Sequence, residues 1–211
     1  DAIPETKFTI RQESLTVTEY ANSIPFTQKL DDLSKHSVTN VINKVMKHDA
    51  RKTLDSAAHV EFDKTPLTVG PATSSTEGDS LTDVVLEVGG ATITNDAPLT
   101  TDHVKKISDI MKERNITPFD GEHFCAIARP AAYRPFKDEL EDIYKYVDQG
   151  FGLIFNGEIG RYEGIRFTEQ TNVASAGWAS GKSDAVYFFG ADTVAEGIVI
   201  PEEIKSGLPC Q

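Results

Sequence analysis

Cysteine and long apolar runs are scarce in this chain of 211 residues, and each absence excludes a class of protein. The two cysteines, Cys125 and Cys210, are too few and too unpatterned for a disulfide framework or a zinc knuckle. No run approaches the roughly 20 apolar residues that a membrane span needs. The first residues, DAIPETKFTI, lack the basic-then-apolar pattern of a secretory signal, so we expect a cytoplasm-like compartment. Because the chain begins with Asp1, we expect it to be processed or part of a longer protein.

Basic residues are also in deficit. Lys and Arg number 21 against 33 Asp and Glu, which gives a formal net charge of −12. Contacts to phosphate groups need clustered cations, so this balance argues against tight binding to nucleic acid or to an anionic membrane. The hydrophobic content of 39% is sufficient for a buried core, and we expect one domain of moderate size or two small lobes.

Complete motifs for nucleotide or metal binding are missing. Gly181-Lys182-Ser183 matches the end of a phosphate-binding loop, but Ala176 stands where the motif needs its first glycine, and a strand-like run follows where a helix is required. His59-Val60-Glu61 and Pro209-Cys210 imitate the two halves of a zinc deaminase signature at far too wide a spacing. We expect a histidine at such a helix end to be a cap or surface group. The sequence therefore predicts no cofactor and no metal.

His123 and Cys125 form the best enzyme-like pair. They lie two positions apart on a predicted strand, so their side chains point to the same face. The apolar surroundings of Cys125 do not favour a reactive thiol, and no G-x-S-x-G motif is present. We expect no catalysis, and a small cytosolic hydrolase that uses these two residues stays the enzyme alternative.

Periodicity predicts an extended arm followed by a long helix. The first 25 residues separate their apolar positions by polar ones and predict an arm with no core of its own. From Thr27 to about His59, apolar residues recur at steps of three and four, typical of an amphipathic helix of roughly 45 Å. Its basic residues predict either a solvated face or a contact with an acidic neighbour; they are Lys44, Lys47, Arg51 and Lys52.

Short strands and two more helices follow. Residues 66–80 are rich in Gly, Pro, Ser and Thr and predict a loop, and residues 83–96 predict a strand pair across Gly89-Gly90. Helices are predicted from a cap at Thr100 or Thr101 to near Asn115, and from Pro135-Phe136 to Gly150. The other predicted strands are HFCAIARP, GLIF, YEGIRFTEQT, AVYFFG and GIVI. This order indicates an α+β architecture, without the strict alternation of a doubly wound sheet.

Five segments of the second half stand in a distinctive order: LTTDHVKKISDIMKERNITPF, HFCAIARP, FKDELEDIYKYV, NGEIGRYEGIRFTEQTN and FFGADTVAEGIVIP. The residues that are distinctive as a set are Gly160, Gly164, Ile165, Arg166, Phe167 and Thr171. This order resembles one group of tailed-bacteriophage major capsid proteins, those of the Hong Kong 97-type fold. LTVTEYANSIPFTQKLDDLSKHSVTNVI resembles the same group's extended loop leading into its spine helix.

The resemblance implies an α+β fold with a long spine helix, a peripheral lobe and an axial lobe. Its expected parts are an arm over 1–27, a peripheral lobe over 28–98, an axial lobe over 99–200, and the start of a return to the peripheral lobe over 201–211, where the family's further strands are missing. It also implies a coat subunit, assembled in the host cytoplasm, that forms hexamers and pentamers of the icosahedral virion shell. The shell would enclose double-stranded DNA without reading its sequence, with scaffolding, portal and decoration proteins as implied partners and no cofactor.

Mixed charges in one predicted strand region mark the candidate subunit contacts, which are Glu158, Arg161, Arg166 and Glu169. Charge reversal at Arg166 is expected to block multimer formation while the subunit stays folded. Two alternatives remain beside the shell subunit. One is the hydrolase described above, and the other is a phage tail or baseplate module, which would form small rings or trimers.

Overall fold

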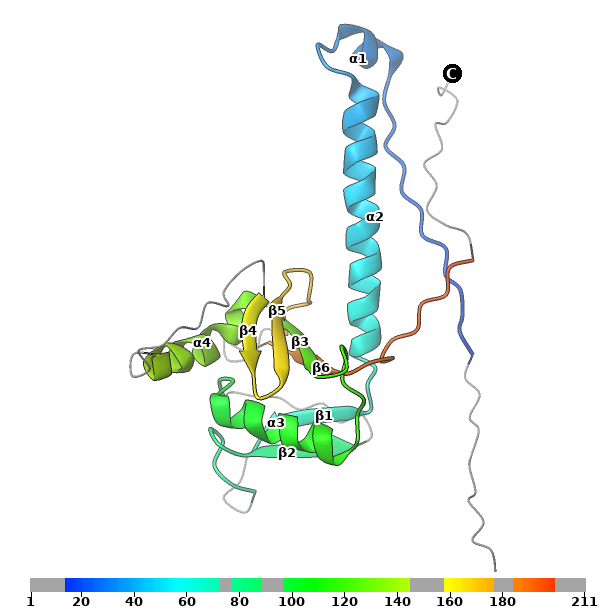
Figure 1. Cartoon of the computed structure of the whole chain (residues 1–211). Coiled ribbons are helices and arrows are strands. Elements are labelled where there is room, and N and C mark those ends of the chain that lie inside the picture. Colours follow the sequence, from blue (N-terminus) through cyan, green and yellow to red (C-terminus); the bar gives the residue numbers. More distant parts are fainter. Residues whose placement is uncertain (1–13, 73–76, 89–96, 145–157, 177–183, 200–211) are drawn as a thin grey trace, which may run out of the picture. The chain divides into compact units, whose positions relative to one another are not determined.

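The computed structural model describes residues 14–72, 77–88, 97–144, 158–176 and 184–199 (Figure 1). The chain divides into two compact units, which we call the first unit (Asp1–Ala50 with Ala195–Gln211) and the second unit (Arg51–Val194). The described elements include both helices and strands, which agrees with the predicted α+β class. No helix within the described ranges is long and apolar enough to cross a membrane. The lobe boundaries expected at residues 28, 99 and 201 stay predictions.

The predicted long helix is two helices, so that prediction was wrong in one respect. Residues 14–27 form neither helix nor strand, as expected for the arm, and are followed by α1 (Gln28–Leu33) and α2 (Val38–Phe62). The break begins at Ser34, whose backbone is extended and whose Oγ donates to the carbonyl oxygen of His36 at 2.6 Å. The Oγ of Ser37 then accepts from the amide of Asn40 at 3.4 Å. Serine hydroxyls that bond the nearby backbone compete with the helical hydrogen bonds. The spacing of apolar residues does not reveal this competition, so it predicted one continuous helix.

A two-stranded antiparallel sheet corrects a second prediction. It pairs β1 (Leu67–Pro71) with β2 (Val84–Val88), with Leu67 opposite Val88. The loop predicted over 66–80 is therefore wrong for β1, because pairing with the apolar β2 outweighs the poor strand propensity of glycine and proline. The expected partner of β2 beyond Gly89-Gly90 lies outside the described residues.

Helix α3 (Thr101–Glu113) begins as predicted, at an N-cap on Thr100. The Thr100 Oγ1 accepts from the amide of His103 and donates to the carbonyl oxygen of Leu81, at 3.2 and 2.7 Å. The His103 ring lies 3.4 Å from the Thr100 amide and completes a capping box.

Helix α4 (Pro130–Tyr144) begins earlier than the predicted start at Pro135-Phe136. Pro130 takes the first helical position, where the missing N–H removes no helical bond. Pro135 therefore stands inside the helix, beside the fully buried Phe136 and Tyr133. Burial of these two rings outweighs the hydrogen bond that an internal proline removes.

A four-stranded sheet follows the order β4-β5-β3-β6. Its strands are β3 (Phe124–Ala128), β4 (Glu158–Tyr162), β5 (Ile165–Glu169) and β6 (Val186–Phe189). Strands β3 and β5 are parallel, and the other two pairs are antiparallel. Glu163 and Gly164, both with positive φ, form the two-residue turn between β4 and β5.

The predicted strands HFCAIARP and AVYFFG are confirmed as β3 and β6, and YEGIRFTEQT contributes the end of β4 and all of β5. The predicted GIVI strand is wrong over Gly197–Val199, which form no strand. Its apolar residues meet no pairing strand in the described part of the first unit, and apolar composition alone does not form a strand. GLIF lies outside the described residues.

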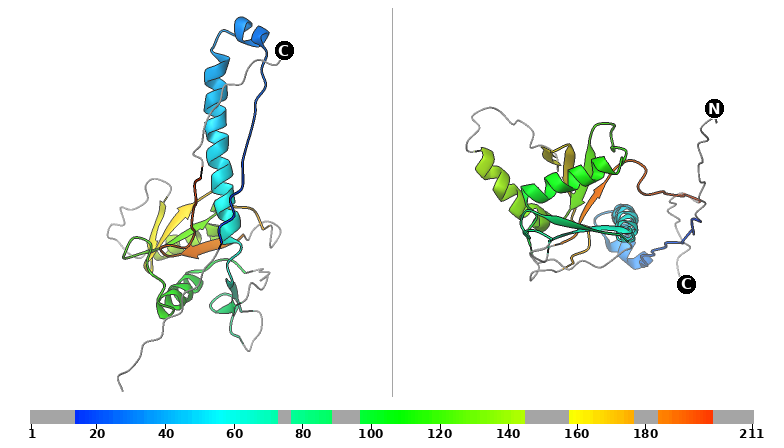
Figure 2. Two further views of the ribbon diagram at one scale, coloured as in Figure 1. Left: turned by 90° about the vertical axis from the view of Figure 1, so that its right-hand side faces the viewer. Right: turned by 90° about the horizontal axis from the view of Figure 1, so that it is seen from below.

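The core of the second unit lies between one face of this sheet and helices α3 and α4 (Figure 2). Its buried members are Val104, Ile107, Met111, Phe124, Ala126, Ala128, Ala132, Tyr133, Phe136, Ile165 and Phe167. Side chains alternate along β6, so Phe188 packs on this core while Tyr187 and Phe189 point to the other face. There the ring of Phe62, at the end of α2, lies 5.4 Å from Tyr187 and 5.1 Å from Phe189.

Candidate functional site

The first unit buries none of its described residues and exposes many apolar ones. We call the following set the apolar arm surface: Leu15, Val17, Tyr20, Phe26, Leu30, Leu33, Val41, Val45, Ile198 and Val199. Their exposed fractions run from 45% at Phe26 to 75% at Leu33. Scattered exposed hydrophobic residues are ordinary, but ten in a unit without a described core are not. Ordering such a segment costs conformational entropy that its own described contacts do not offset.

Two described contacts join the arm to distant parts of the first unit. Asn22 Nδ2 donates to the Asp49 carboxylate on α2 at 2.7 Å. Leu15 packs against Gly197 so closely that a Cβ added at Gly197 would lie 2.4 Å from Leu15 Cδ2. These two contacts leave most of the apolar arm surface open.

The sheet brings three of the four predicted contact residues to one face and separates the fourth. Arg161 pairs with Arg166 across β4 and β5, and Glu158 stands opposite Thr168, so these positions share the face away from the core. Glu169 lies on the opposite face, where its carboxylate pairs with Lys137 of α4. Glu169 therefore helps to hold α4 against the sheet, a role that strand composition did not reveal.

The two arginines stand directly opposite each other in the register, an arrangement that places like charges side by side. Arg161 is exposed and Arg166 is half-buried. Like charges at directly opposed positions destabilise a strand pair, so a nearby carboxylate is favoured at this face. The contact role of Glu158, Arg161 and Arg166 stays a prediction.

A polar cluster joins the end of α2 to the outer face of the sheet. We call it the α2 cluster; it consists of Asp55, His59, Asp63, Gln170, Asn172 and Tyr187. Asp55 Oδ2 accepts from the amide groups of Gln170 and Asn172 at 3.1 and 2.7 Å. Its Oδ1 lies 3.6 Å from His59 Nε2. His59 is buried, so its assignment to a cap or surface position was wrong.

Aromatic and phenolic contacts complete the α2 cluster. The His59 ring stacks on Tyr187 with centroids 5.9 Å apart. The Tyr187 hydroxyl donates to Asp63 Oδ1 at 2.6 Å. Burial and this carboxylate raise the pKa of Tyr187, so the phenol stays a neutral donor. The sequence signal for this site was the spacing of Asp55, His59 and Asp63 at four-residue steps, which places all three on one side of a helix.

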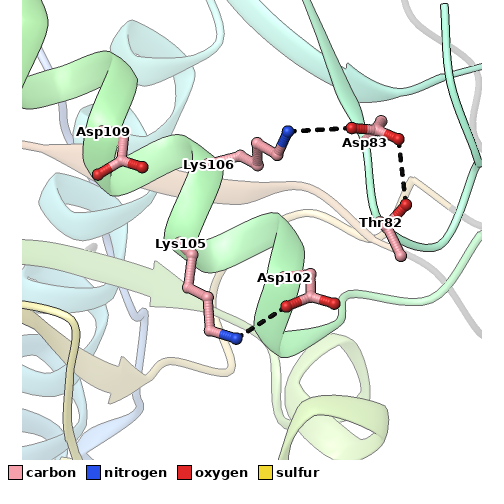
Figure 3. A pocket seen from close by; sticks show the side chains of 6 residues that line it. All are labelled: Thr82, Asp83, Asp102, Lys105, Lys106 and Asp109. Carbon is pink, nitrogen blue, oxygen red and sulfur yellow. Dashed lines mark hydrogen bonds and ion pairs between the residues drawn. The ribbon is translucent and has the colours of Figure 1, made fainter.

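A hollow of about 450 Å³ lies on the exposed side of α3 (Figure 3). Lys106 pairs with Asp83 at 3.0 Å and Lys105 pairs with Asp102 at 2.8 Å. The bond from Lys106 lowers the pKa of Asp83, and the bond to Asp102 raises the pKa of Lys105. Both ammonium groups already have a carboxylate partner, so we assign this hollow to surface ion pairing.

The enzyme-like pair does not form an accessible nucleophilic site. Cys125 is buried, and His123 Nδ1 lies 3.4 Å from Asp120 Oδ1. The amide of His123 also donates to this carboxylate and lowers the pKa of Asp120. Among the residues that the structure describes, no group of three His, Cys, Asp or Glu side chains could hold a metal ion. Gly181-Lys182-Ser183 and Cys210 lie outside the described residues.

Comparison of the chain with protein families, with curated proteins and with solved structures found no match in any of the three.

Proposed function

We propose that the chain is a structural subunit that self-assembles, and specifically a coat subunit of a tailed-phage shell with the Hong Kong 97-type fold. The observation that carries the proposal is the apolar arm surface, ten exposed apolar side chains in a unit that buries none of its described residues. The second unit has a core of its own, so the demand for a partner is concentrated in the first unit. The order of segments that resembles phage coat proteins supports the specific form of the proposal.

Identical copies suit this surface because they are available at the required ratio and close into rings by rotation. Each contact can be of ordinary size, because a ring or shell multiplies modest contacts. The net charge of −12 suits a container of DNA, since a strongly basic wall would bind the phosphate backbone tightly. In this proposal the apolar arm surface is covered by a neighbouring copy after assembly.

The test compares two neighbouring positions on α2. Val41→Asp removes an apolar side chain that is 57% exposed, and Asn40→Asp adds the same charge at the next residue, which is also exposed. Covering Val41 contributes about 1 kcal/mol to a contact, and a buried carboxylate costs more, so Val41→Asp should raise the dissociation constant about tenfold or more. Asn40→Asp should assemble like the unchanged chain. Sedimentation velocity over a range of concentrations and electron microscopy provide the readout.

Three results would count against the proposal. A chain that stays a compact monomer at high concentration has no need of copies. Equal assembly by the two variants would remove the apolar arm surface from the contact. Small rings or trimers without closed particles would favour the tail or baseplate alternative.

Charge reversal at Arg166 tests the sheet face separately. Arg166→Glu should reduce assembly while far-UV circular dichroism stays unchanged. Unchanged assembly would remove Glu158, Arg161 and Arg166 from the contact and leave the arm as its main element.

A further inference from the structure

His59 combines deep burial with an incomplete set of hydrogen bonds. Its residue exposure is 5%, and neither ring nitrogen has a hydrogen-bond partner among the residues that the structure describes. A neutral imidazole presents one N–H donor and one acceptor nitrogen. Leaving such groups buried without partners is costly, and each one in a native structure calls for an explanation.

The groups around His59 come from three elements. From α2 and the residue after it come two carboxylates, Asp55 and Asp63, four residues before and after the histidine. Strand β6 contributes Tyr187, whose raised pKa keeps it neutral. The segment after β5 contributes the neutral amides of Gln170 and Asn172. Within the described residues of this cluster, the charged groups facing the ring are therefore both anionic.

Proton uptake would change what the ring can do. Both nitrogens then become donors, and the acceptor at 3.6 Å is Asp55 Oδ1. Closing this gap to the roughly 2.8 Å of a charge-assisted hydrogen bond needs a side-chain shift of less than about 1 Å. The ring would keep its stack on Tyr187, which favours a cation above an aromatic face. Because Asp55 is already held by Gln170 and Asn172, the new bond would connect α2 to the segment after β5.

We propose that the α2 cluster is a proton-operated latch, in which uptake of a proton by His59 closes its Nε2–H on Asp55 and fixes the end of α2 to the sheet. Histidine is the side chain that ordinarily changes charge between about pH 5 and 8. The latch therefore closes on acidification and opens when the proton is released. The inference does not depend on the shell proposal, because every contact in it lies inside the second unit.

Amide exchange at the end of α2 provides a local reporter. The amide of Asp63 donates to the carbonyl oxygen of His59 at 3.2 Å, so its exchange follows opening of this last turn. A local probe is needed because His103, in α3, responds to acid in the opposite sense. Burial lowers the pKa of His103, so acid weakens the fold there.

The experiment measures exchange of the Asp63 amide in the full chain at about pH 5.5 and 7.5, corrected for the intrinsic effect of pH on exchange. We expect protection to be about tenfold higher at the lower pH, as for one charge-assisted hydrogen bond. His59→Phe keeps a ring against Tyr187 but takes up no proton, and Asp55→Asn removes the charged acceptor. Both should show no rise in protection. His48→Gln, at an exposed histidine of the same helix, should behave like the unchanged chain.

Two outcomes would overturn the latch. Protection in the unchanged chain that is equal at the two pH values would show that no proton-linked closure occurs. A rise that persists in His59→Phe would assign the effect to another group. Because the first comparison needs no variant, the proposal stays testable even if a substitution at this buried position prevents folding.

Discussion

Phe167 is the position at which the core of the second unit can be tested most directly. Its exposure is 1%, and its ring lies 5.0 Å from Phe136, 5.7 Å from Tyr133 and 6.4 Å from Phe188. Phe167→Ala removes the apolar transfer energy, leaves a cavity and breaks these aromatic contacts. Substitutions of this kind cost about 3–5 kcal/mol, and three ring contacts in a fully buried site place Phe167→Ala near the upper half of that range, at about 4 kcal/mol. This is a large share of the roughly 5–15 kcal/mol that stabilises an ordinary domain.

Urea unfolding followed by circular dichroism measures this effect. With a slope of about 2 kcal/mol per M, a loss of about 4 kcal/mol lowers the midpoint by about 2 M. The matched control is Phe119→Ala, because Phe119 is 53% exposed and, within the described ranges, makes one aromatic edge contact, with Phe189 at 5.8 Å. We expect about 1 kcal/mol or less for this control. If the two variants shifted the midpoint equally, or if Phe167→Ala cost less than about 1 kcal/mol, the assignment of the core to the space between α3, α4 and the sheet would be refuted.

Two further predictions concern the ends of α3 and β6. Gly190→Ala should destabilise the chain more than Gly164→Ala, because a Cβ at Gly190 would lie 2.1 Å from the Thr117 carbonyl oxygen. A Cβ at Gly164 would meet open space, so the cost there is only the strain of a positive φ. The urea midpoints of the two variants measure the difference. His103→Gln should keep α3 capped, since glutamine also serves in a capping box, and should remove a loss of stability on acidification. Burial lowers the pKa of His103 in the folded state, so the unfolded chain takes up the proton more readily. The unchanged chain therefore loses stability as the pH falls through the ordinary histidine range. In His103→Gln this loss is absent, and the urea midpoints at pH 7.5 and 5.5 should lie closer together.

Several elements were predictable from the sequence because their signals are local. Helix α3 combines an N-cap threonine with apolar residues at helical spacing, and both act within a few residues of one another. Strands β3 and β6 are short runs of apolar or aromatic residues beside turn or proline signals. The exposed arm followed from apolar residues that are separated by polar ones and have no matching partner nearby. The shared face of the predicted contact positions Glu158 and Arg161 was not a local signal, because they stand three residues apart and only the register irregularity between Glu158 and Gly160 brings them to one side of β4.

Other features depended on partners that are distant in the sequence. Strand β1 exists because β2 lies beside it, and its glycine and proline give no local sign of this pairing. In the sequence, Glu169 is not distinguished from its charged neighbours, and only its position in β5 places its carboxylate beside Lys137. His59 likewise has the sequence context of an ordinary helix-end histidine, and its burial depends on the contact with Tyr187 of β6. Periodicity and capping are set by forces along a few residues of chain, so the sequence determined α3, the strands β3 and β6 and the exposed arm. Burial and charge pairing depend on which surfaces meet across more than 100 residues, and only the tertiary structure decided that Asp55, Asn172 and Tyr187 form one site around His59.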